Sequence, residues 1–197
     1  MTSDTAIYIF VLAGAYLLGS VPFGIIAARL FGGADPRQSG SRNIGATNVV
    51  RTAGKAAGVL TLVLDTLKGA AVVYLSIRYV NDPLLTALAG GSAFLGHIFP
   101  VFLGFKGGKG VATALGVMII LAPYATILSA AIFAIIVAFK RYVSLGSIIA
   151  ATSLPAFLYL FKPGLYTLAL SVFISAIVVI KHKENIKRLV EGRENKI

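Results

Sequence analysis

Apolar residues in this 197-residue chain stand in long runs that polar residues interrupt at few places. A helix that crosses the hydrocarbon core of a bilayer needs about 20 mostly apolar residues. Five runs are long enough: Ile7–Phe31, Ala56–Val80, Pro83–Phe105, Val143–Phe161 and Gly164–Ile180. The pattern therefore predicts an all-α fold, namely a polytopic membrane helical bundle.

A sixth apolar stretch, Val111–Phe139, is too long for one span and somewhat short for two. Near its middle stand Ala122, Pro123 and Tyr124. Proline lacks a backbone N–H and clashes with the preceding turn, so it ends or kinks a helix. We predict a tight pair of short helices here, which brings the expected number of transmembrane helices to seven.

The basic residues favour seven spans, because with that number they gather on one side of the membrane. That side carries four clusters: Arg37, Arg42, Arg51 and Lys55, then Lys106 and Lys109, then Lys140 and Arg141, then six residues from Lys181 onward. The other side carries Arg78 and Lys162. Since cytoplasmic loops hold the excess of Lys and Arg, we expect the N-terminus outside and the C-terminus in the cytoplasm.

Composition agrees with a membrane protein, since 57% of the residues are hydrophobic and 13% are charged. The chain has no cysteine, which removes disulfides and thiolate catalysis. Its net charge of +11 is dispersed between apolar runs, so nucleic acid is not an expected partner.

No basic residue precedes Ile7, so the first run is expected to be a retained span. We find no internal repeat or linker and predict a single integral membrane domain over residues 1–197.

The longest polar segment, Gly32–Gly54, is predicted to be an interfacial loop that binds an anion. Its glycines let backbone N–H groups turn towards one point, its Ser, Thr and Asn side chains add donors, and arginine suits phosphate oxygens. The ordinary alternative is a flexible polar loop whose charges follow the topology rule. The density of donors favours a site, and the donors are Ser39, Ser41, Arg42, Asn43, Thr47, Asn48 and Arg51.

A second loop, Lys106–Gly110, feeds a helix that is expected to begin near Val111 and to include Thr113. A helix N-terminus attracts phosphate through its dipole and its unpaired N–H groups, and two lysines reinforce it. The spacing does not fit a Walker A loop, so ATP or GTP hydrolysis is unsupported. The alternative is a short inside loop with two snorkelling lysines.

Several ionisable residues lie within or beside the spans. Asp65 and Lys68 are three residues apart on one helix face, where they form either a structural ion pair or part of a site. His97 and His182 can each act as a base near neutral pH, although a lone histidine is more often structural. Only two histidines are present and there is no HExxH motif, so a metal site is not expected.

The motifs taken together closely resemble, in order and over most of the chain, those of the bacterial acyl-phosphate:glycerol-3-phosphate acyltransferase family. They are Gly19-Ser20-Val21-Pro22-Phe23-Gly24, the Ser39–Arg51 loop, Asp65-Thr66-Leu67-Lys68-Gly69, Gly96-His97-Ile98-Phe99-Pro100, Lys106-Gly107-Gly108-Lys109-Gly110-Val111-Ala112-Thr113 and His182-Lys183-Glu184-Asn185-Ile186-Lys187-Arg188-Leu189. One local departure is Arg42, where members usually have glycine.

The resemblance implies transfer of a fatty acyl group from acyl phosphate to the 1-hydroxyl of glycerol 3-phosphate. The products would be lysophosphatidic acid and inorganic phosphate, in the first step of bacterial phospholipid synthesis. No cofactor is implied. The implied partners are glycerol 3-phosphate, membrane lipid, and acyl phosphate supplied by a soluble phosphate acyltransferase. The implied location is the bacterial inner membrane, with a multi-pass chain and an active site that faces the cytoplasm.

From the residues and the resemblance together we assign candidate roles. The expected catalytic residues are Ser41, Asn43, Arg51, Lys109 and His182. The expected substrate-binding residues are Ser39, Thr47, Asn48, Lys68, His97, Lys106, Thr113, Ser147 and Asn185. Lys109 and Arg51 would neutralise phosphates, and His182 with Asn185 would orient the glycerol moiety. The proton of the attacking hydroxyl would pass to a substrate phosphate oxygen or to His182.

Two other classes of protein compete with this interpretation. A transporter for a small organic phosphate would also place basic residues in a helical bundle, with its site near the midplane. A non-catalytic membrane scaffold would leave the intramembrane charges and the two glycine loops without a purpose. The clustering of donors on the predicted inner side favours an enzyme that takes a water-soluble substrate from the cytoplasm.

Overall fold

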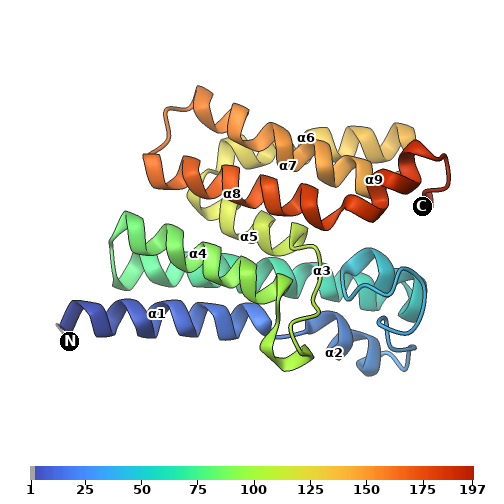
Figure 1. The fold of residues 1–197 in the computed structure, drawn as a ribbon, viewed down its shortest axis with the longest axis horizontal. Helices are drawn as coiled ribbons and strands as arrows, with labels where there is room; N and C mark the ends of the chain where they lie inside the picture. The colour runs from blue at the N-terminus through green and yellow to red at the C-terminus, as the bar shows by residue number, and fades with distance from the viewer. Residues whose placement is uncertain (1–2) are drawn as a thin grey trace. The chain divides into compact units, whose positions relative to one another are not determined.

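The computed structural model describes residues 3–197, and these residues form helices joined by short loops (Figure 1). No strand occurs among them, which confirms the all-α prediction. The helices are α1 (Ser3–Ser20), α2 (Phe23–Leu30), α3 (Ala46–Tyr79), α4 (Pro83–Ile98), the short 3₁₀ helix η1 (Val101–Leu103), α5 (Val111–Leu121), α6 (Pro123–Lys140), α7 (Val143–Leu160), α8 (Leu165–Lys181) and α9 (Lys183–Val190).

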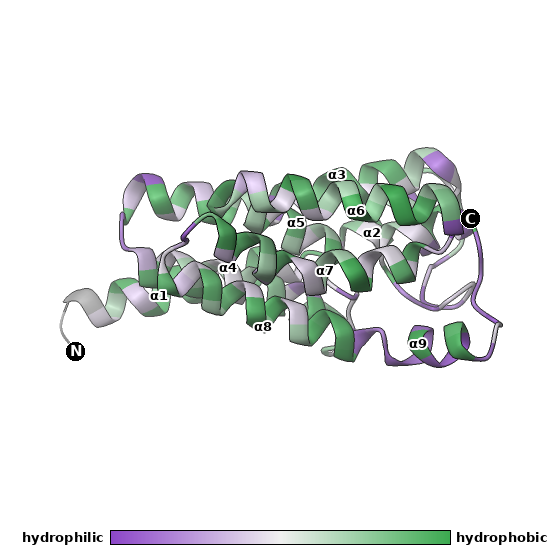
Figure 2. Ribbon diagram, turned by 90° about the horizontal axis from the view of Figure 1, so that it is seen from above, coloured by the Kyte–Doolittle hydropathy of each residue, from purple (hydrophilic) through white to green (hydrophobic). Residues whose placement is uncertain are grey.

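The described helices are apolar enough for a multi-pass membrane protein, and most of their length is hydrophobic in Figure 2. Five segments are long enough to cross, and a sixth results if α8 and α9, bent by 57°, form one span. The predicted break at Pro123 is confirmed, because α5 ends at Leu121 and α6 begins at the proline. The 11 residues of α5 extend about 16 Å, which is short of a core about 30 Å thick. Seven full spans stay a prediction.

The helices group into two compact units, Met1–Val117 and Met118–Ile197, and each is described by itself. In the first unit, α1 packs along α4, and α3 packs against α2 and α4. Glycines permit the contact of α1 with α4: a Cβ on Gly19 would fall on the backbone of Ala93, and one on Gly96 would fall on the carbonyl of Tyr16. Small residues let membrane helices approach closely in this way.

In the second unit, α7 packs against both α6 and α8. Gly146 on α7 lies against the side chains of Phe133 and Val137 on α6. After α8 the chain bends by 57° into α9, where hydrophilic and hydrophobic residues alternate along the helix in Figure 2, as in amphipathic helices that lie at a membrane interface. The single domain predicted from the sequence stays a prediction.

The helix α3 corrects one expectation about the polar segment Gly32–Gly54. Loop structure was expected up to Gly54, but the helix begins at Ala46, so the expectation is wrong for residues 46–53. Gly54 still breaks the helix, since its φ of 88° is open to glycine at little cost. A short helical piece therefore precedes the main span, and it presents its N-terminus to the loop.

Candidate active site

The loop between α2 and α3 is held closed by the side chain of Asn48. The Nδ2 group donates to the carbonyl oxygens of Pro36 and Asn43 at 2.8 and 2.9 Å, and it lies 3.2 Å from that of Ser39. Its Oδ1 accepts a hydrogen bond from the backbone N–H of Ser41 at 2.8 Å. Asn48 is 2% exposed. The sequence predicted this residue as a substrate ligand, whereas in the structure its amide organises the loop.

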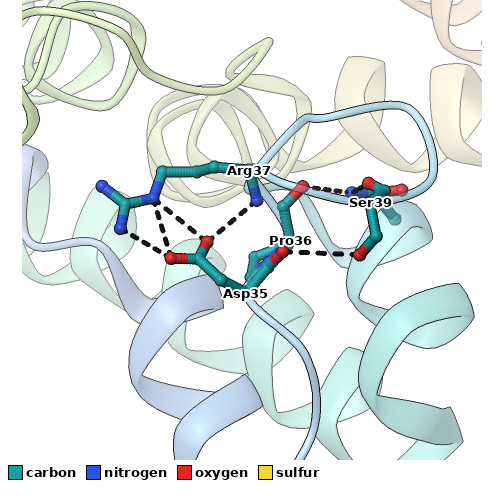
Figure 3. Close-up of polar contacts among 5 residues, drawn as sticks. Asp35, Pro36, Arg37 and Ser39 are labelled. Carbon is teal, nitrogen blue, oxygen red and sulfur yellow. Dashed lines mark hydrogen bonds and ion pairs between the residues drawn. The ribbon is translucent and has the colours of Figure 1, made fainter.

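An ion pair stands where this loop begins. Arg37 Nη2 lies 2.6 Å from Asp35 Oδ2, and the backbone N–H of Arg37 donates to Asp35 Oδ1 at 2.9 Å (Figure 3). The hydroxyl of Ser39 donates to the carbonyl of Asp35 at 3.4 Å. The hydrogen bonds from Arg37 lower the pKa of Asp35 from 3.8 to about 2. Arg37 is thus paired with Asp35, and its side chain is exposed, as are those of Arg42 and Arg51.

The N-terminus of α3 lies next to these donors. Asn43 Oδ1 accepts from the backbone N–H of Gly45 at 2.8 Å, and Gly45 is the residue that caps α3. Thr47 and Arg51 follow on α3, one helical turn apart. Ser41 and Arg51 are exposed, and Asn43 and Thr47 are half-buried. Because a helix N-terminus carries partial positive charge, this arrangement can bind an anion.

A buried polar cluster joins α3 and α4. Lys68 Nζ lies 2.7 Å from Asp65 Oδ1 and donates to the carbonyl of Val21 at 3.0 Å. It also lies 3.1 Å from His97 Nδ1. Asp65 Oδ1 lies 3.5 Å from the same ring nitrogen, so Nδ1 of His97 faces both a donor and an acceptor. Lys68 and His97, both predicted as substrate ligands, are therefore members of an internal network.

The Lys106–Gly110 loop packs directly on His97. The backbone N–H of Gly108 donates to the carbonyl of His97 at 3.1 Å. A Cβ on Gly107 would fall on that carbonyl, and a Cβ on Gly108 would fall on the imidazole Nε2. Lys106 is exposed and Lys109 is half-buried. The two glycines thus let the loop lie directly on the histidine, with a lysine on either side.

The first turns of α5 pack tightly on α3. Thr113 is fully buried, and a Cβ on Gly69 would fall on its carbonyl oxygen. Further along, a Cβ on Gly116 would fall on the carbonyl of Thr66. Thr113, which was predicted to bind substrate, therefore lies in the helix contact, and its hydroxyl has no hydrogen-bond partner among the described residues.

In the second unit, three predicted residues lie near the junction of α7, α8 and α9. His182 is 3% exposed and its Nδ1 lies 2.7 Å from the carbonyl oxygen of Val178. A carbonyl oxygen can only accept, so the Nδ1 carries the proton and Nε2 is the basic nitrogen of the neutral ring. Ser147 donates to the carbonyl of Val143 at 2.9 Å, and Asn185 donates to Glu194 at 2.6 Å.

Comparison with known proteins decides the family. The profile of the glycerol-3-phosphate acyltransferase family matches residues 9–192. The chain belongs to this family. A glycerol-3-phosphate acyltransferase of Syntrophotalea carbinolica is 50% identical over 194 residues, which cover 98% of each protein. One of Geobacter sulfurreducens is 48% identical over 185 residues, which cover 93% of this chain and 94% of the relative.

Two solved structures of the integral membrane glycerol 3-phosphate acyltransferase PlsY (YgiH) share the fold. The glycerol 3-phosphate form superposes with a TM-score of 0.91 at 43% identity, and the lysophosphatidic acid form with 0.89 at 42%. Each match covers 96% of this chain and 95% of the solved one. The resemblance drawn from the motifs is confirmed, and the fold is that of a PlsY-type integral membrane acyltransferase.

The sequence did not point to Glu194 or to its contact with Ser144. No side chain caps α7, and the Ser144 hydroxyl donates to Glu194 Oε1 at 2.7 Å. Fifty residues separate the two, so no local pattern could have paired them. Glu194 is one of three glutamates in the basic tail, so its residue type does not single it out.

Proposed function

We propose that this chain transfers a fatty acyl group from acyl phosphate to the 1-hydroxyl of glycerol 3-phosphate. The ester bond forms as the carbonyl carbon loses its bond to the phosphate oxygen, which gives lysophosphatidic acid and inorganic phosphate. The observation that carries the proposal is the likeness to two PlsY structures, one in a glycerol 3-phosphate form and one in a lysophosphatidic acid form. These are an acceptor and a product of that reaction.

The chemistry suits a chain with few catalytic side chains. Acyl phosphate is a mixed anhydride that already has a good leaving group, so no covalent nucleophile is required and positioning with charge stabilisation can supply most of the rate. Both substrates carry phosphate, so the reaction needs two anion subsites. The α3 N-terminus with Arg51 and the Lys106–Gly110 loop are the two candidates, with Lys109 neutralising the phosphate of one substrate.

The remaining roles follow the sequence assignment, adjusted for the contacts in the structure. Ser41 and Asn43 belong to the α3 subsite, where loop N–H groups stabilise the carbonyl oxyanion. His182 orients the glycerol moiety, and its Nε2 can accept the hydroxyl proton if a phosphate oxygen does not. Asn48, Lys68 and His97 support the loops, while Ser39, Thr47, Lys106, Ser147 and Asn185 bind substrate; Thr113 supports the start of α5.

The proposed setting is the bacterial inner membrane. Seven spans, counted with α5 as one of them, would put the N-terminus outside and all four basic clusters in the cytoplasm, on the side where glycerol 3-phosphate is found. Acyl phosphate would come from a soluble phosphate acyltransferase and keep its chain in lipid. No cofactor enters the scheme.

The test is release of inorganic phosphate when the purified protein is mixed with acyl phosphate and glycerol 3-phosphate. We expect release that depends on both substrates, and we expect Lys109→Ala to lower it at least a hundredfold because a phosphate loses its counter-charge. Lys162→Ala, which changes an exposed lysine in the connection from α7 to α8, should keep normal activity. Near-normal turnover by Lys109→Ala in a folded protein would refute the assigned anion subsite.

A further inference from the structure

The Lys68 ammonium contacts two other segments of the first unit, namely the break between α1 and α2 and the end of α4. At the break, Nζ donates to the Val21 carbonyl at 3.0 Å and lies 5.6 Å from the centroid of the Phe23 ring, within the range of a cation–π contact. On α4, it lies 3.1 Å from His97 Nδ1. The lysine side chain is 2% exposed, so water does not compete for these contacts.

The contacts at the break lead to the loop between α2 and α3. Pro22 separates α1 from α2, so no continuous helix fixes the position of α2. Gly24, in the first turn of α2, lies so close to the end of the loop that an added Cβ would fall on the Ile44 carbonyl. Ile44 is buried and directly precedes Gly45, the cap of α3. Lys68 thus holds the segment on which the α3 N-terminus rests.

The contact on α4 leads to the Lys106–Gly110 loop. Gly108 donates its backbone N–H to the His97 carbonyl at 3.1 Å, and an added Cβ on Gly108 would fall on the His97 Nε2. Lys109 is the next residue. The histidine that Lys68 contacts on one side therefore supports this loop on the other.

Each loop also has hydrogen bonds that do not involve Lys68. The Asn48 amide closes the loop between α2 and α3, and the Lys106–Gly110 loop is bonded to the His97 carbonyl. Without the ammonium, each loop should still be able to bind an anion. What should change is the position of one loop relative to the other.

We infer that Lys68 is a positioning residue that sets the two anion subsites relative to each other. The proposed reaction brings the hydroxyl of one phosphorylated substrate to the carbonyl carbon of another, so the two phosphates have to be held at a fixed separation. The inference rests on the proposed function, because it takes both loops to bind substrate. It assigns Lys68 to the alignment of the two substrates and not to the binding of either one.

A purely structural ion pair makes a different prediction. If Lys68 and Asp65 only balance each other within α3, removing both charges should leave a folded protein with unchanged kinetics. If Lys68 aligns the subsites, the same folded protein should bind both substrates and react slowly.

The decisive variant is therefore Asp65→Asn with Lys68→Met, which removes both charges and keeps side chains of similar size. We expect kcat to fall about tenfold, with the KM of glycerol 3-phosphate and that of acyl phosphate each within twofold of the parent. The kcat is expressed per glycerol 3-phosphate site counted by calorimetric titration, so that a misfolded fraction does not lower it.

Ser76→Ala with Thr86→Val is the matched control. Ser76 Oγ lies 3.0 Å from Thr86 Oγ1, and this buried contact also joins α3 to α4, next to the connection between the two helices. The control removes both hydroxyls together, so no polar partner is left unsatisfied, and kcat per site should stay within twofold of the parent.

Unchanged kcat per site in the charge-free variant would overturn the inference, because the pair would then be structural only. A rise of more than fivefold in the KM of one substrate alone would also overturn it, since Lys68 would then serve a single subsite. A parent protein that releases no phosphate from the two substrates would instead refute the proposed function, and the inference with it.

Phe23→Leu decides the question if the charge-free variant does not fold. This substitution removes the ring beside the ammonium and leaves the ion pair in place, and we expect kcat per site to fall about threefold with both KM values unchanged. Normal kcat in Phe23→Leu would then overturn the inference.

Discussion

Two polar clusters, one in each unit, stabilise a buried charge in different ways. In the first, Lys68 and Asp65 stand one turn apart on a single helix, and both side chains are at most 3% exposed. In the second, Glu194 gathers donors from α7 and α9, and its partner Arg188 is 34% exposed. The first cluster balances its charge inside one helix, whereas the second depends on a tail that folds back.

The difference teaches what each cluster can do. A fully buried ion pair is costly to break and changes little with conditions, so the Lys68 cluster is suited to hold His97 and the glycine loop in place. The Glu194 cluster lies at the edge of the helices, where its partner Arg188 is 34% exposed, so breaking it should cost less. Substitutions should therefore cost more stability in the first cluster than in the second.

The largest effect is expected from Asp65→Asn. Removing one charge leaves the Lys68 ammonium buried without its counter-charge, and such a change costs about 3–5 kcal/mol in the free energy of unfolding. Denaturant unfolding of the purified protein in detergent measures it. The double variant Asp65→Asn with Lys68→Met should regain much of the loss, since no charge then remains. A cost below about 1 kcal/mol for the single variant would show that the pair does not carry the stability of α3.

A smaller effect, shared between stability and kinetics, is expected from Gly108→Ala. The added methyl would fall on the His97 ring, so the loop must shift, at a cost of about 1–3 kcal/mol. Because Lys109 moves with the loop, kcat/KM should fall about tenfold. Gly164→Ala is the control: it has a φ of −61° and no atom within 4 Å of an added Cβ, so we expect no measurable change. Wild-type activity of Gly108→Ala would show that the position of this loop does not affect the reaction.

The smallest effect is expected from Arg37→Gln, which removes an exposed ion pair. Asp35 has a pKa of about 2 in the folded chain against 3.8 for the ordinary group. The pair therefore contributes stability above pH 3.8 and loses it as the pH falls through 2. Since Arg37 is exposed, the difference from the parent at pH 7 should be at most about 1 kcal/mol, and 0.5 M salt should reduce it. A change in activity greater than twofold would place Arg37 in the site after all.

Much of the fold could be predicted from the sequence, because spans depend on local composition. Runs of apolar residues fixed the main helices, and Pro123 marked the break between α5 and α6. The boundary at Gly54 was misplaced, since a glycine with positive φ can stand between two helical pieces as well as at the end of a loop. The length of α5 depends on the residue at which the preceding Lys106–Gly110 loop ends, and hydropathy does not mark that residue.

The candidate site was only partly predictable. Glycines and basic residues made both loops candidate anion sites, because those residue types suit a backbone that binds phosphate. The same residue types do not reveal which side chain binds substrate and which stabilises the loop. Asn48 was therefore predicted to bind substrate, whereas its Oδ1 accepts a hydrogen bond from the backbone N–H of Ser41. The contacts of Glu194 with Ser144 join distant segments, and such pairings exist only after folding.

The close approach of α3 and α5 has a consequence for how the protein is made. A helix of 11 residues is too short to remain across a bilayer on its own, yet Gly69 and Gly116 let its backbone lie against that of α3. The ribosome finishes α3 well before α5, so the earlier helix can serve as a template in the membrane. A bulkier residue at position 69 should thus leave the newly made chain mis-inserted and subject to degradation, before any question of catalysis arises.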